Sequence, residues 1–264
     1  MPAPFAAELE TALAAASAAA GLIVARGGAD AVREKGRADL VTAVDEAAER
    51  TIAALVRERH PGDAIVGEEL SAEHVHAGRR WYVDPVDGTT NFVHGHPFVC
   101  TSIGFADGEG LAAAVVHAPL LGDVFHAVRG GGAFRNGRPI RVTATGDPAR
   151  ALLATGFPFK SGKGDLHGYM RLVADAVHAT RDVRRAGSAA LDLAYVAAGI
   201  VEGFFEIGLA PWDVAAGMLL VSEAGGRVTG WPGDTAPPLE SGRVLASNGR
   251  LHGWLEGLVD GRGL

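Results

Sequence analysis

The sequence predicts an α/β protein in which layers of helix and sheet alternate, and three observations lead to this prediction. Apolar residues recur at helical spacing along the start of the chain, from Phe5 to Ile23. Residues 64–142 contain short strand-like apolar runs separated by turn signals. Beyond about residue 147, further strand-like runs alternate with helical segments, so both halves of the chain mix the two element types.

Helices are expected where apolar spacing and stop signals agree. The first helix is predicted to end at Gly27-Gly28, and the second to run from about Asp45 to His60, before Pro61-Gly62. Further helices are predicted over residues 164–181, 188–198 and 214–224, and a short one near the end of the chain.

Strands are expected in short apolar runs, and two of these runs end in acidic residues. Residues 64–66 lead into Gly67-Glu68-Glu69, and residues 81–83 lead into Asp84, so both are expected to deliver carboxylates to one place. The other predicted strands lie within residues 99–142 and at residues 151–155, 201–207, 227–229 and 244–246. A change of character near residue 146 predicts two lobes of one compact unit, residues 1–146 and residues 147–264.

Composition limits the classes of partner and compartment. The chain has 264 residues and a formal net charge of −7, which argues against nucleic acid as the main ligand because backbone binding needs a basic face. No stretch is apolar enough to suggest a membrane span, and Glu8 and Glu10 interrupt the N-terminal apolar run of a possible signal peptide. The single cysteine, Cys100, is predicted to be a buried apolar residue, and a cytoplasmic protein is expected.

The segment most informative about chemistry is Asp-Pro-Val-Asp-Gly-Thr-Thr at residues 84–90. Asp84 and Asp87 flank a proline that stiffens the predicted turn, and their carboxylates are hard oxygen ligands suited to Mg²⁺. Gly88 allows close backbone approach, and Thr89 offers an amide and a hydroxyl to a phosphate group. The alternative is a solvated turn, because Asp-Gly is a common turn dipeptide.

Two further acidic fragments have plain structural alternatives when each is taken alone. Glu68 follows a predicted strand and is also typical of a solvated loop, and Asp213 in Trp212-Asp213 stands at a predicted helix start, where it is also typical of an N-cap. The close histidine pairs His74/His76 and His94/His96 lack the spacing of a helical zinc site, so loop or packing roles are favoured for them.

Taken in order, the three fragments resemble the metal-binding signature of the inositol monophosphatase family, which runs Gly-Glu-Glu, Asp-Pro-Ile/Leu-Asp-Gly-Thr and then Trp-Asp. Val86 stands where isoleucine or leucine is usual. The resemblance extends from Lys35 to Gly226 and includes the stretches at residues 38–45 and 91–95. It implies a two-lobed α-β-α-β-α sandwich with the site between the lobes, a homodimer, and a lithium-sensitive, Mg²⁺-dependent phosphatase.

The resemblance also implies a set of metal ligands. Glu68, Asp84 and the carbonyl of Val86 would hold one Mg²⁺ ion, and Asp84, Asp87 and Asp213 would hold a second. A third, weaker ion near Glu68 would join during turnover, so two or three ions are expected. Such a pair of ions clamps the attacking and the leaving oxygen of a phosphoryl group.

Other residues gain implied roles in catalysis and phosphate binding. The amides of Gly88 and Thr89 would bind the phosphate, and the Thr89 hydroxyl, supported by Asp45, would help Glu68 to orient the attacking water. Lys35 lies in a predicted loop that closes near the metals in related proteins; the alternative for Lys35 is a solvated loop lysine.

Substrate choice is expected to depend on the second half of the chain. Ser188 and Ala189 resemble the family's Gly-Thr/Ser-Ala turn beside the leaving alcohol, and Glu206 matches a position that accepts a hydrogen bond from an inositol hydroxyl. A plain acidic residue at a strand end is the alternative for Glu206. The substrate ranked first is myo-inositol 1-phosphate, ahead of histidinol phosphate, fructose 1,6-bisphosphate and 3′-phosphoadenosine 5′-phosphate. A non-enzymatic alternative is a regulatory protein that binds factors of transcription or ribosome assembly.

Overall fold

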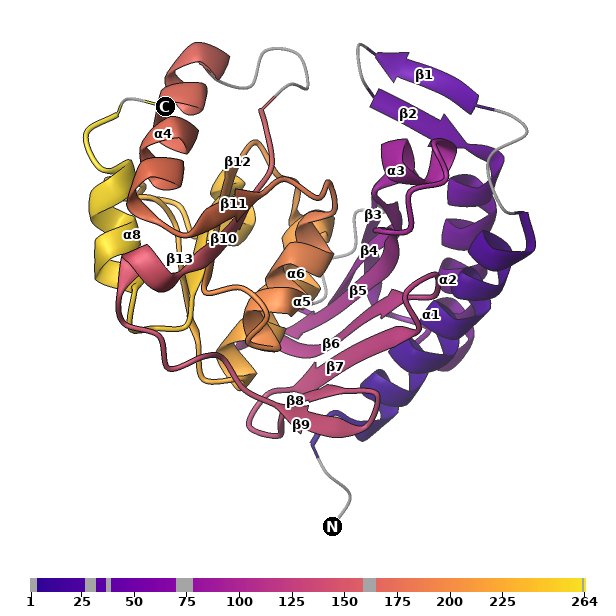
Figure 1. Ribbon diagram of the computed structural model, residues 1–264. Coiled ribbons are helices and arrows are strands. Elements are labelled where there is room, and N and C mark those ends of the chain that lie inside the picture. The colour runs from indigo at the N-terminus through magenta and orange to yellow at the C-terminus, as the bar shows by residue number, and fades with distance from the viewer. Residues whose placement is uncertain (1–3, 27–31, 37–38, 70–77, 159–164, 263) are drawn as a thin grey trace.

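The chain folds into five layers in the order helix, sheet, helix, sheet, helix, as expected from the family resemblance (Figure 1). The computed structural model describes residues 4–26, 32–36, 39–69, 78–158, 165–262 and 264. The layers arise because each sheet has two apolar faces, and each face is covered by helices.

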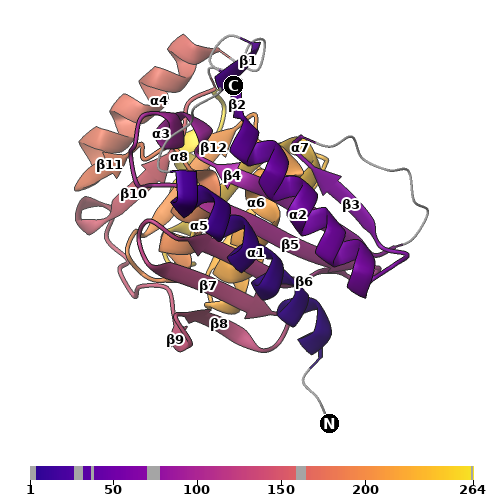
Figure 2. The same cartoon turned by 90° about the vertical axis from the view of Figure 1, so that its right-hand side faces the viewer.

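The first sheet has seven strands and is antiparallel except for its first pair (Figure 2). Its strands, in spatial order, are β3 (Ala64–Gly67), β4 (Arg80–Asp87), β5 (Cys100–Asp107), β6 (Gly110–Ala118), β7 (Asp123–Val128), β8 (Gly132–Arg135) and β9 (Arg138–Ile140). Helices α1 (Ala6–Arg26) and α2 (Ala43–Arg59) lie side by side across its outer face. The fully buried rings of Trp81 and Phe105 fill this interface.

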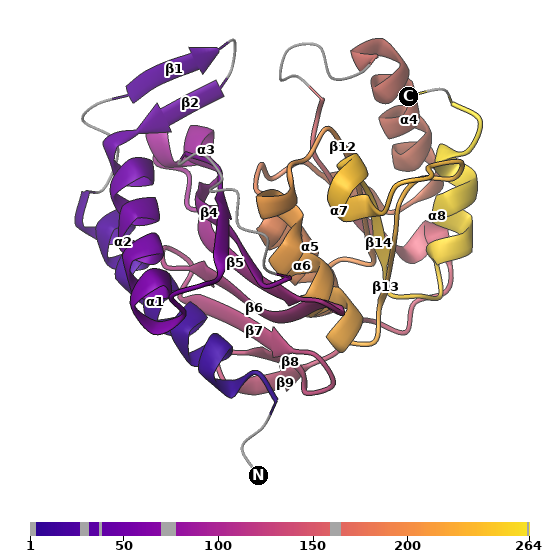
Figure 3. The same ribbon diagram turned by 180° about the vertical axis from the view of Figure 1, so that it is seen from behind.

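The second sheet has five strands of mixed direction (Figure 3). In spatial order they are β11 (Asp182–Arg184), β10 (Leu152–Thr155), β12 (Gly203–Ile207), β14 (Arg243–Ser247) and β13 (Arg227–Thr229). Helices α4 (Leu166–Ala179) and α8 (His252–Val259) cover its outer face, while α5 (Ala189–Ala197) and α6 (Pro211–Glu223) lie between the two sheets. The remaining short elements are β1 (Val32–Gly36), β2 (Asp39–Thr42), α3 (Thr89–Val93), η1 (Pro148–Arg150) and α7 (Pro238–Ser241).

Small residues let the middle helices approach their neighbours closely. A Cβ added at Gly104 of β5 would stand 2.8 Å from the Cβ of Ala215, so α6 rests directly on the first sheet. A Cβ added at Gly217 would stand 2.5 Å from the Cβ of Leu193, which brings α5 and α6 equally close together. These contacts hold α6 against the first sheet and α5 against α6.

Most predicted elements are confirmed, and the differences concern short or turn-like segments. Lys35 was expected in a loop, but it lies in β1, which pairs with β2 in an antiparallel hairpin. The side chain of Lys35 and the predicted stop at Gly27-Gly28 lie outside the described part of the chain. Elements of three to five residues, such as β11 and α3, are too short for a periodic pattern to reveal them.

Helix α1 corrects the expectation that no stretch is apolar enough to span a membrane. By length and composition alone, residues 6–25 could cross a bilayer, with a mean hydropathy of 1.4, because alanine counts as apolar. In the structure this helix forms part of a layer: Ala12, Ala15, Ala16 and Ala19 are buried against the sheet and α2.

The predicted division near residue 146 falls between β9 and η1. The largest apolar cluster joins Val116 and Phe125 of the first sheet to Leu193 of α5 and Phe204 of the second sheet. Because this core spans both halves, the separation into two lobes stays a prediction.

Candidate active site

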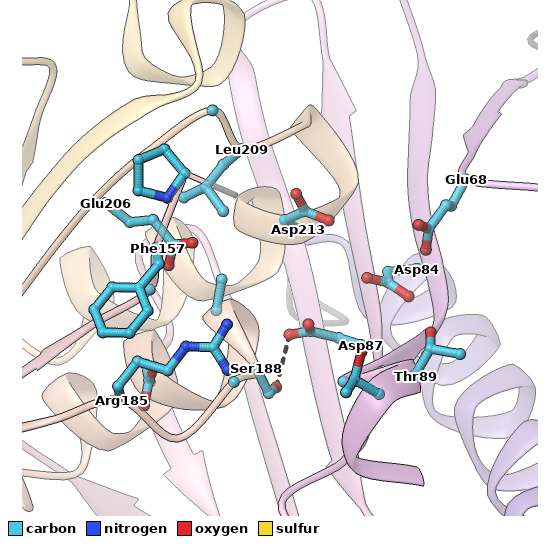
Figure 4. Close-up of a pocket in the computed structure, with 18 of the residues that line it drawn as sticks. Glu68, Asp84, Asp87, Thr89, Phe157, Arg185, Ser188, Glu206, Leu209 and Asp213 are labelled. Atoms are coloured by element: carbon cyan, nitrogen blue, oxygen red, sulfur yellow. Dashed lines mark hydrogen bonds between the residues drawn. The ribbon is translucent and has the colours of Figure 1, made fainter. Parts of the chain in front are cut away.

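One cavity of about 310 Å³ gathers nearly all of the predicted site residues from distant parts of the chain (Figure 4). The predicted residues that line it are Glu68, Asp84, Val86, Asp87, Gly88, Thr89, Ser188, Ala189, Glu206 and Asp213. Asp45 is fully buried behind Thr89 and does not line the cavity. The cavity therefore lies where the end of β4 meets the middle helices and the second sheet.

A β-bulge explains how two aspartates three residues apart reach the same side of β4. In a regular strand, residues i and i+3 point to opposite faces. Here Asp84 pairs with Ser102 and Asp87 pairs with Cys100, so three steps along β4 match two along β5. The segment was predicted as a turn, and it is instead the bulged end of a strand. Pro85 fits there because a bulge leaves one residue outside the hydrogen-bond ladder.

Asp87 is held by the first turn of α5. Its Oδ2 accepts hydrogen bonds from the Ser188 hydroxyl and the Ala190 amide, each at 2.7 Å. The Cys100 thiol lies beside this pair, 3.5 Å from the Ser188 oxygen. Burial, followed by the charge of Asp87, raises the pKa of Cys100 well above its ordinary value, which suits a buried residue rather than a nucleophile. Ser188 and Asp87 thus join the two halves of the molecule at this point.

Thr89 is positioned by Asp45 at the start of α2. The Thr89 Oγ1 lies 3.1 Å from Asp45 Oδ1 and 3.1 Å from the carbonyl oxygen of Val86. Asp45 in turn accepts hydrogen bonds from the backbone and the hydroxyl of Thr42, the N-cap of α2. Gly88 precedes Thr89 with a φ of 98°, and a Cβ there would stand 2.9 Å from the Phe98 carbonyl, so only glycine fits.

Glu68 follows β3 in a short segment that α2 supports from behind. Glu49 of α2 is fully buried, and its carboxylate accepts a hydrogen bond from the Glu69 amide at 2.7 Å. A Cβ added at Gly67 would stand 1.9 Å from Glu49 Oε1. Glu49 therefore contacts the residues on both sides of Glu68, although the sequence analysis did not single it out.

Asp213 reaches the cavity from the first turn of α6, facing Glu68 and Asp84 across the cavity in Figure 4. It is the third residue of the helix and not its N-cap, and its Oδ2 accepts a hydrogen bond from the Ala210 amide at 2.7 Å. The hydroxyl of Ser102, the residue paired with Asp84, donates to the Trp212 carbonyl at 3.3 Å. This bond ties the start of α6 to the bulged end of β4.

The acidic residues that line this part of the cavity repel one another. Burial raises the pKa of Asp84 well above its ordinary value, and the charges of Glu68, Asp87, Asp213 and Asp45 raise it further. A divalent cation would relieve this repulsion. Among the described residues no three acidic, histidine or cysteine side chains are close enough to hold one ion as they stand. Mg²⁺ keeps several waters in its coordination shell, so it does not require all neighbouring carboxylates to stand at bonding distance before it binds. The donor chemistry therefore fits magnesium.

The opposite wall comes from the second half of the chain. Glu206 of β12 lies against the backbone of Gly156, where a Cβ would stand 2.0 Å from Glu206 Oε1. The guanidinium of Arg185 lies 5.3 Å from the ring centroid of Phe157, and both residues line the cavity. Asp192, one helical turn beyond Ser188, also lines it. Asp192 and Phe157 were not among the predicted site residues; the four-residue spacing from Ser188 is the signal that could have revealed Asp192.

One of the two histidine pairs can be placed relative to this cavity. His94 and His96 are absent from its lining, and His74 and His76 lie outside the described residues.

Comparison with known proteins agrees with the geometry. The sequence pattern of the inositol monophosphatase family matches residues 6–261. The chain is 46% identical over 221 residues to the Nus factor SuhB of Pseudomonas aeruginosa, covering 82% of this chain and 81% of that protein. It is 42% identical to an inositol-1-monophosphatase of Synechocystis sp., covering 84% of this chain and 77% of that protein.

The fold is also shared with solved structures. The extragenic suppressor protein SuhB of Bartonella henselae superposes with a TM-score of 0.91 at 35% identity, over 97% of this chain and 99% of that chain. Fold, site geometry and sequence pattern lead to one conclusion. The chain belongs to the inositol monophosphatase family.

Proposed function

We propose that this protein is a Mg²⁺-dependent phosphatase that hydrolyses a small phosphate monoester, with myo-inositol 1-phosphate as the favoured substrate. The observation that carries the proposal is the cavity in which hard oxygen ligands from β4 and α6 face a glycine–threonine turn at the start of α3. Membership of the family supports the general chemistry. The specific ester is the finer part of the proposal.

The proposed metal ligands are those expected from the sequence. Glu68, Asp84 and the Val86 carbonyl would hold one ion, and Asp84, Asp87 and Asp213 a second, with two or three ions in all. Bound Mg²⁺ would activate water and neutralise charge on the phosphoryl oxygens. Sensitivity to Li⁺ is proposed for the same site.

The chain's own groups would orient the reactants. Asp45 accepts a hydrogen bond from the Thr89 hydroxyl, with 3.1 Å between Asp45 Oδ1 and Thr89 Oγ1. The lone pairs of the Thr89 oxygen would then be available to accept a hydrogen bond from the attacking water. Glu68 would orient the same water, and the amides of Gly88 and Thr89 would bind the phosphate. Lys35 stays a predicted further contact.

Ser188, Ala189 and Glu206 are proposed to lie beside the leaving alcohol. Glu206 is acceptor-only when ionised, which suits the hydroxyl groups of a polyol. Histidinol phosphate, fructose 1,6-bisphosphate and 3′-phosphoadenosine 5′-phosphate are the competing substrates. A homodimer in the cytoplasm completes the proposal.

Phosphate release from these four esters tests the proposal, first with Mg²⁺ and then with EDTA. We expect Mg²⁺-dependent release with the highest kcat/KM on inositol 1-phosphate. Preference for another ester would retain the metal chemistry and reject the substrate. Absence of Mg²⁺-dependent release from all four esters would reject the enzyme.

A second candidate function is a regulatory role in transcription, favoured by the 46% identity to a protein named Nus factor SuhB. No nucleic-acid partner was expected from the net charge, and the similarity to a Nus factor does not support that expectation. The two functions separate in a strain that lacks this protein. Rescue of its phenotype by wild type but not by Asp87→Asn would favour the enzyme, whereas equal rescue by both would favour the regulatory role.

A further inference from the structure

Asp192 is a buried carboxylate of the cavity wall that the roles proposed above do not use. Only 3% of the residue is exposed, and it lines the cavity from the first turn of α5. Its amide donates to the Ser188 carbonyl at 3.0 Å, so the helix backbone fixes its position. The same turn of α5 holds Asp87 through the Ala190 amide.

The carboxylate of Asp192 has no hydrogen-bond donor among the residues that the structure describes. Its electrostatic neighbours are Glu206 and Asp87, which repel it, and Arg185, which attracts it. Burial, followed by the charges of Glu206 and Asp87, raises the pKa of Asp192 well above its ordinary value, so the ionised carboxylate is disfavoured unless a ligand donates to it. A buried polar group without a partner calls for a functional explanation, and a ligand in the cavity could supply the missing donor.

We propose that Asp192 belongs to the leaving-alcohol subsite and, beside Glu206, accepts a hydrogen bond from a further hydroxyl group of the substrate. The subsite rests on the proposed phosphatase function and narrows its substrate class to polyol phosphates. A carboxyl group accepts hydrogen bonds through its oxygens, so the subsite suits donors such as hydroxyls. Among the described residues, Arg185 is the cation that attracts Asp192.

Kinetics on two phosphate esters can distinguish a contact of Asp192 with the leaving alcohol from a role in metal binding. myo-Inositol 1-phosphate carries hydroxyls on its leaving group, whereas p-nitrophenyl phosphate carries none. We expect Asp192→Asn to lower kcat/KM for inositol 1-phosphate by about 10-fold, the effect of one hydrogen bond to a charged acceptor. Hydrolysis of p-nitrophenyl phosphate and the Mg²⁺ concentration for half-maximal rate should stay within about twofold of wild type.

The control is Asp260→Asn, which removes the same charge from an exposed position after α8 and should change neither ester. Thermal unfolding of both variants verifies that they fold, and Asp192→Ala replaces Asp192→Asn if the asparagine protein does not. Equal losses on the two esters, or a raised Mg²⁺ requirement, would overturn the subsite in favour of metal positioning. Unchanged kinetics on inositol 1-phosphate would also overturn it.

Failure of the proposed function gives a different result. If wild type releases no phosphate from either ester, calorimetric binding of inositol 1-phosphate tests the subsite without turnover. Binding that is about 10-fold weaker in Asp192→Asn would support the subsite, and equal binding, or none to wild type, would overturn it.

Discussion

The two walls of the cavity are built in different ways. The wall with Asp84, Asp87 and Thr89 comes from one short segment, and each of these side chains forms a hydrogen bond of 2.7–3.1 Å with a described backbone group or side chain. The wall with Arg185 and Glu206 is assembled from separate elements of the second half. The first wall suits chemistry shared by a whole family, because it is preorganised; the second can change its leaving-group contacts one at a time.

The largest effect is expected at the first wall. Asp87→Asn keeps an oxygen that can accept from Ser188 and Ala190, so the thermal midpoint should change little. The variant loses a proposed metal-binding charge, and phosphatase activity should fall on the order of 100-fold or more, since even indirect supports of a metal site contribute 10- to 100-fold. Steady-state kinetics over a range of Mg²⁺ concentrations measures this loss. Full activity of Asp87→Asn at every Mg²⁺ concentration would show that the first wall tolerates substitution as well as the second wall does.

The segment behind Glu68 tests whether preorganisation of the first wall is needed. Gly67→Ala places a Cβ 1.9 Å from Glu49 Oε1 and should displace Glu68, which lowers kcat by about 10- to 100-fold. Gly62→Ala is the matched control, because nothing lies within 4 Å of its added Cβ. Similar kinetics for the two alanine variants would mean that the position of Glu68 does not limit the reaction.

The acidic first wall should make the free energy of unfolding of the metal-free protein depend on pH, and bound Mg²⁺ should raise that free energy. The raised pKa of Asp84 means that the folded chain binds a proton more tightly than the unfolded chain. In EDTA the free energy of unfolding should therefore fall as the pH rises from the ordinary aspartate value of 3.8 through the raised pKa. Mg²⁺ at ten times its Kd should add about 1.4 kcal/mol at neutral pH. Denaturant unfolding measures both trends, and a matching pH dependence in Asp84→Asn would contradict the assignment.

The smallest effect is expected at the second wall. Glu206→Gln keeps an oxygen acceptor but loses its charge, so kcat/KM for inositol 1-phosphate should fall by about 5-fold. Activity on p-nitrophenyl phosphate should be unaffected, because that leaving group has no hydroxyl for Glu206 to bind. A loss shared by both esters would place Glu206 with the first wall.

The same contrast explains how much the sequence could predict. The layered α/β fold and the segments around Glu68, Asp84 and Asp213 were predictable, because short motifs record local chemistry and periodicity records element type. The bulge in β4 was not, since a strand containing Pro85 reads as a turn until its pairing with β5 is known.

Contacts between distant segments were out of reach of the sequence. Glu49 bonds the Glu69 amide across 20 positions, and Asp192 reaches the cavity only because α5 is packed between two sheets. The four-residue spacing from Ser188 is the one local sign for Asp192. Glu49 carries no such sign, because it stands among other charged residues of α2.

The most direct test of a magnesium-dependent first wall is a Mg²⁺ titration of phosphate release from inositol 1-phosphate by wild type and Asp87→Asn. We predict that wild type is active only with Mg²⁺ and is silenced by EDTA, and that Asp87→Asn stays at least about 100-fold slower at saturating Mg²⁺. Release that persists in EDTA, or equal rates for the two proteins, would contradict the proposal.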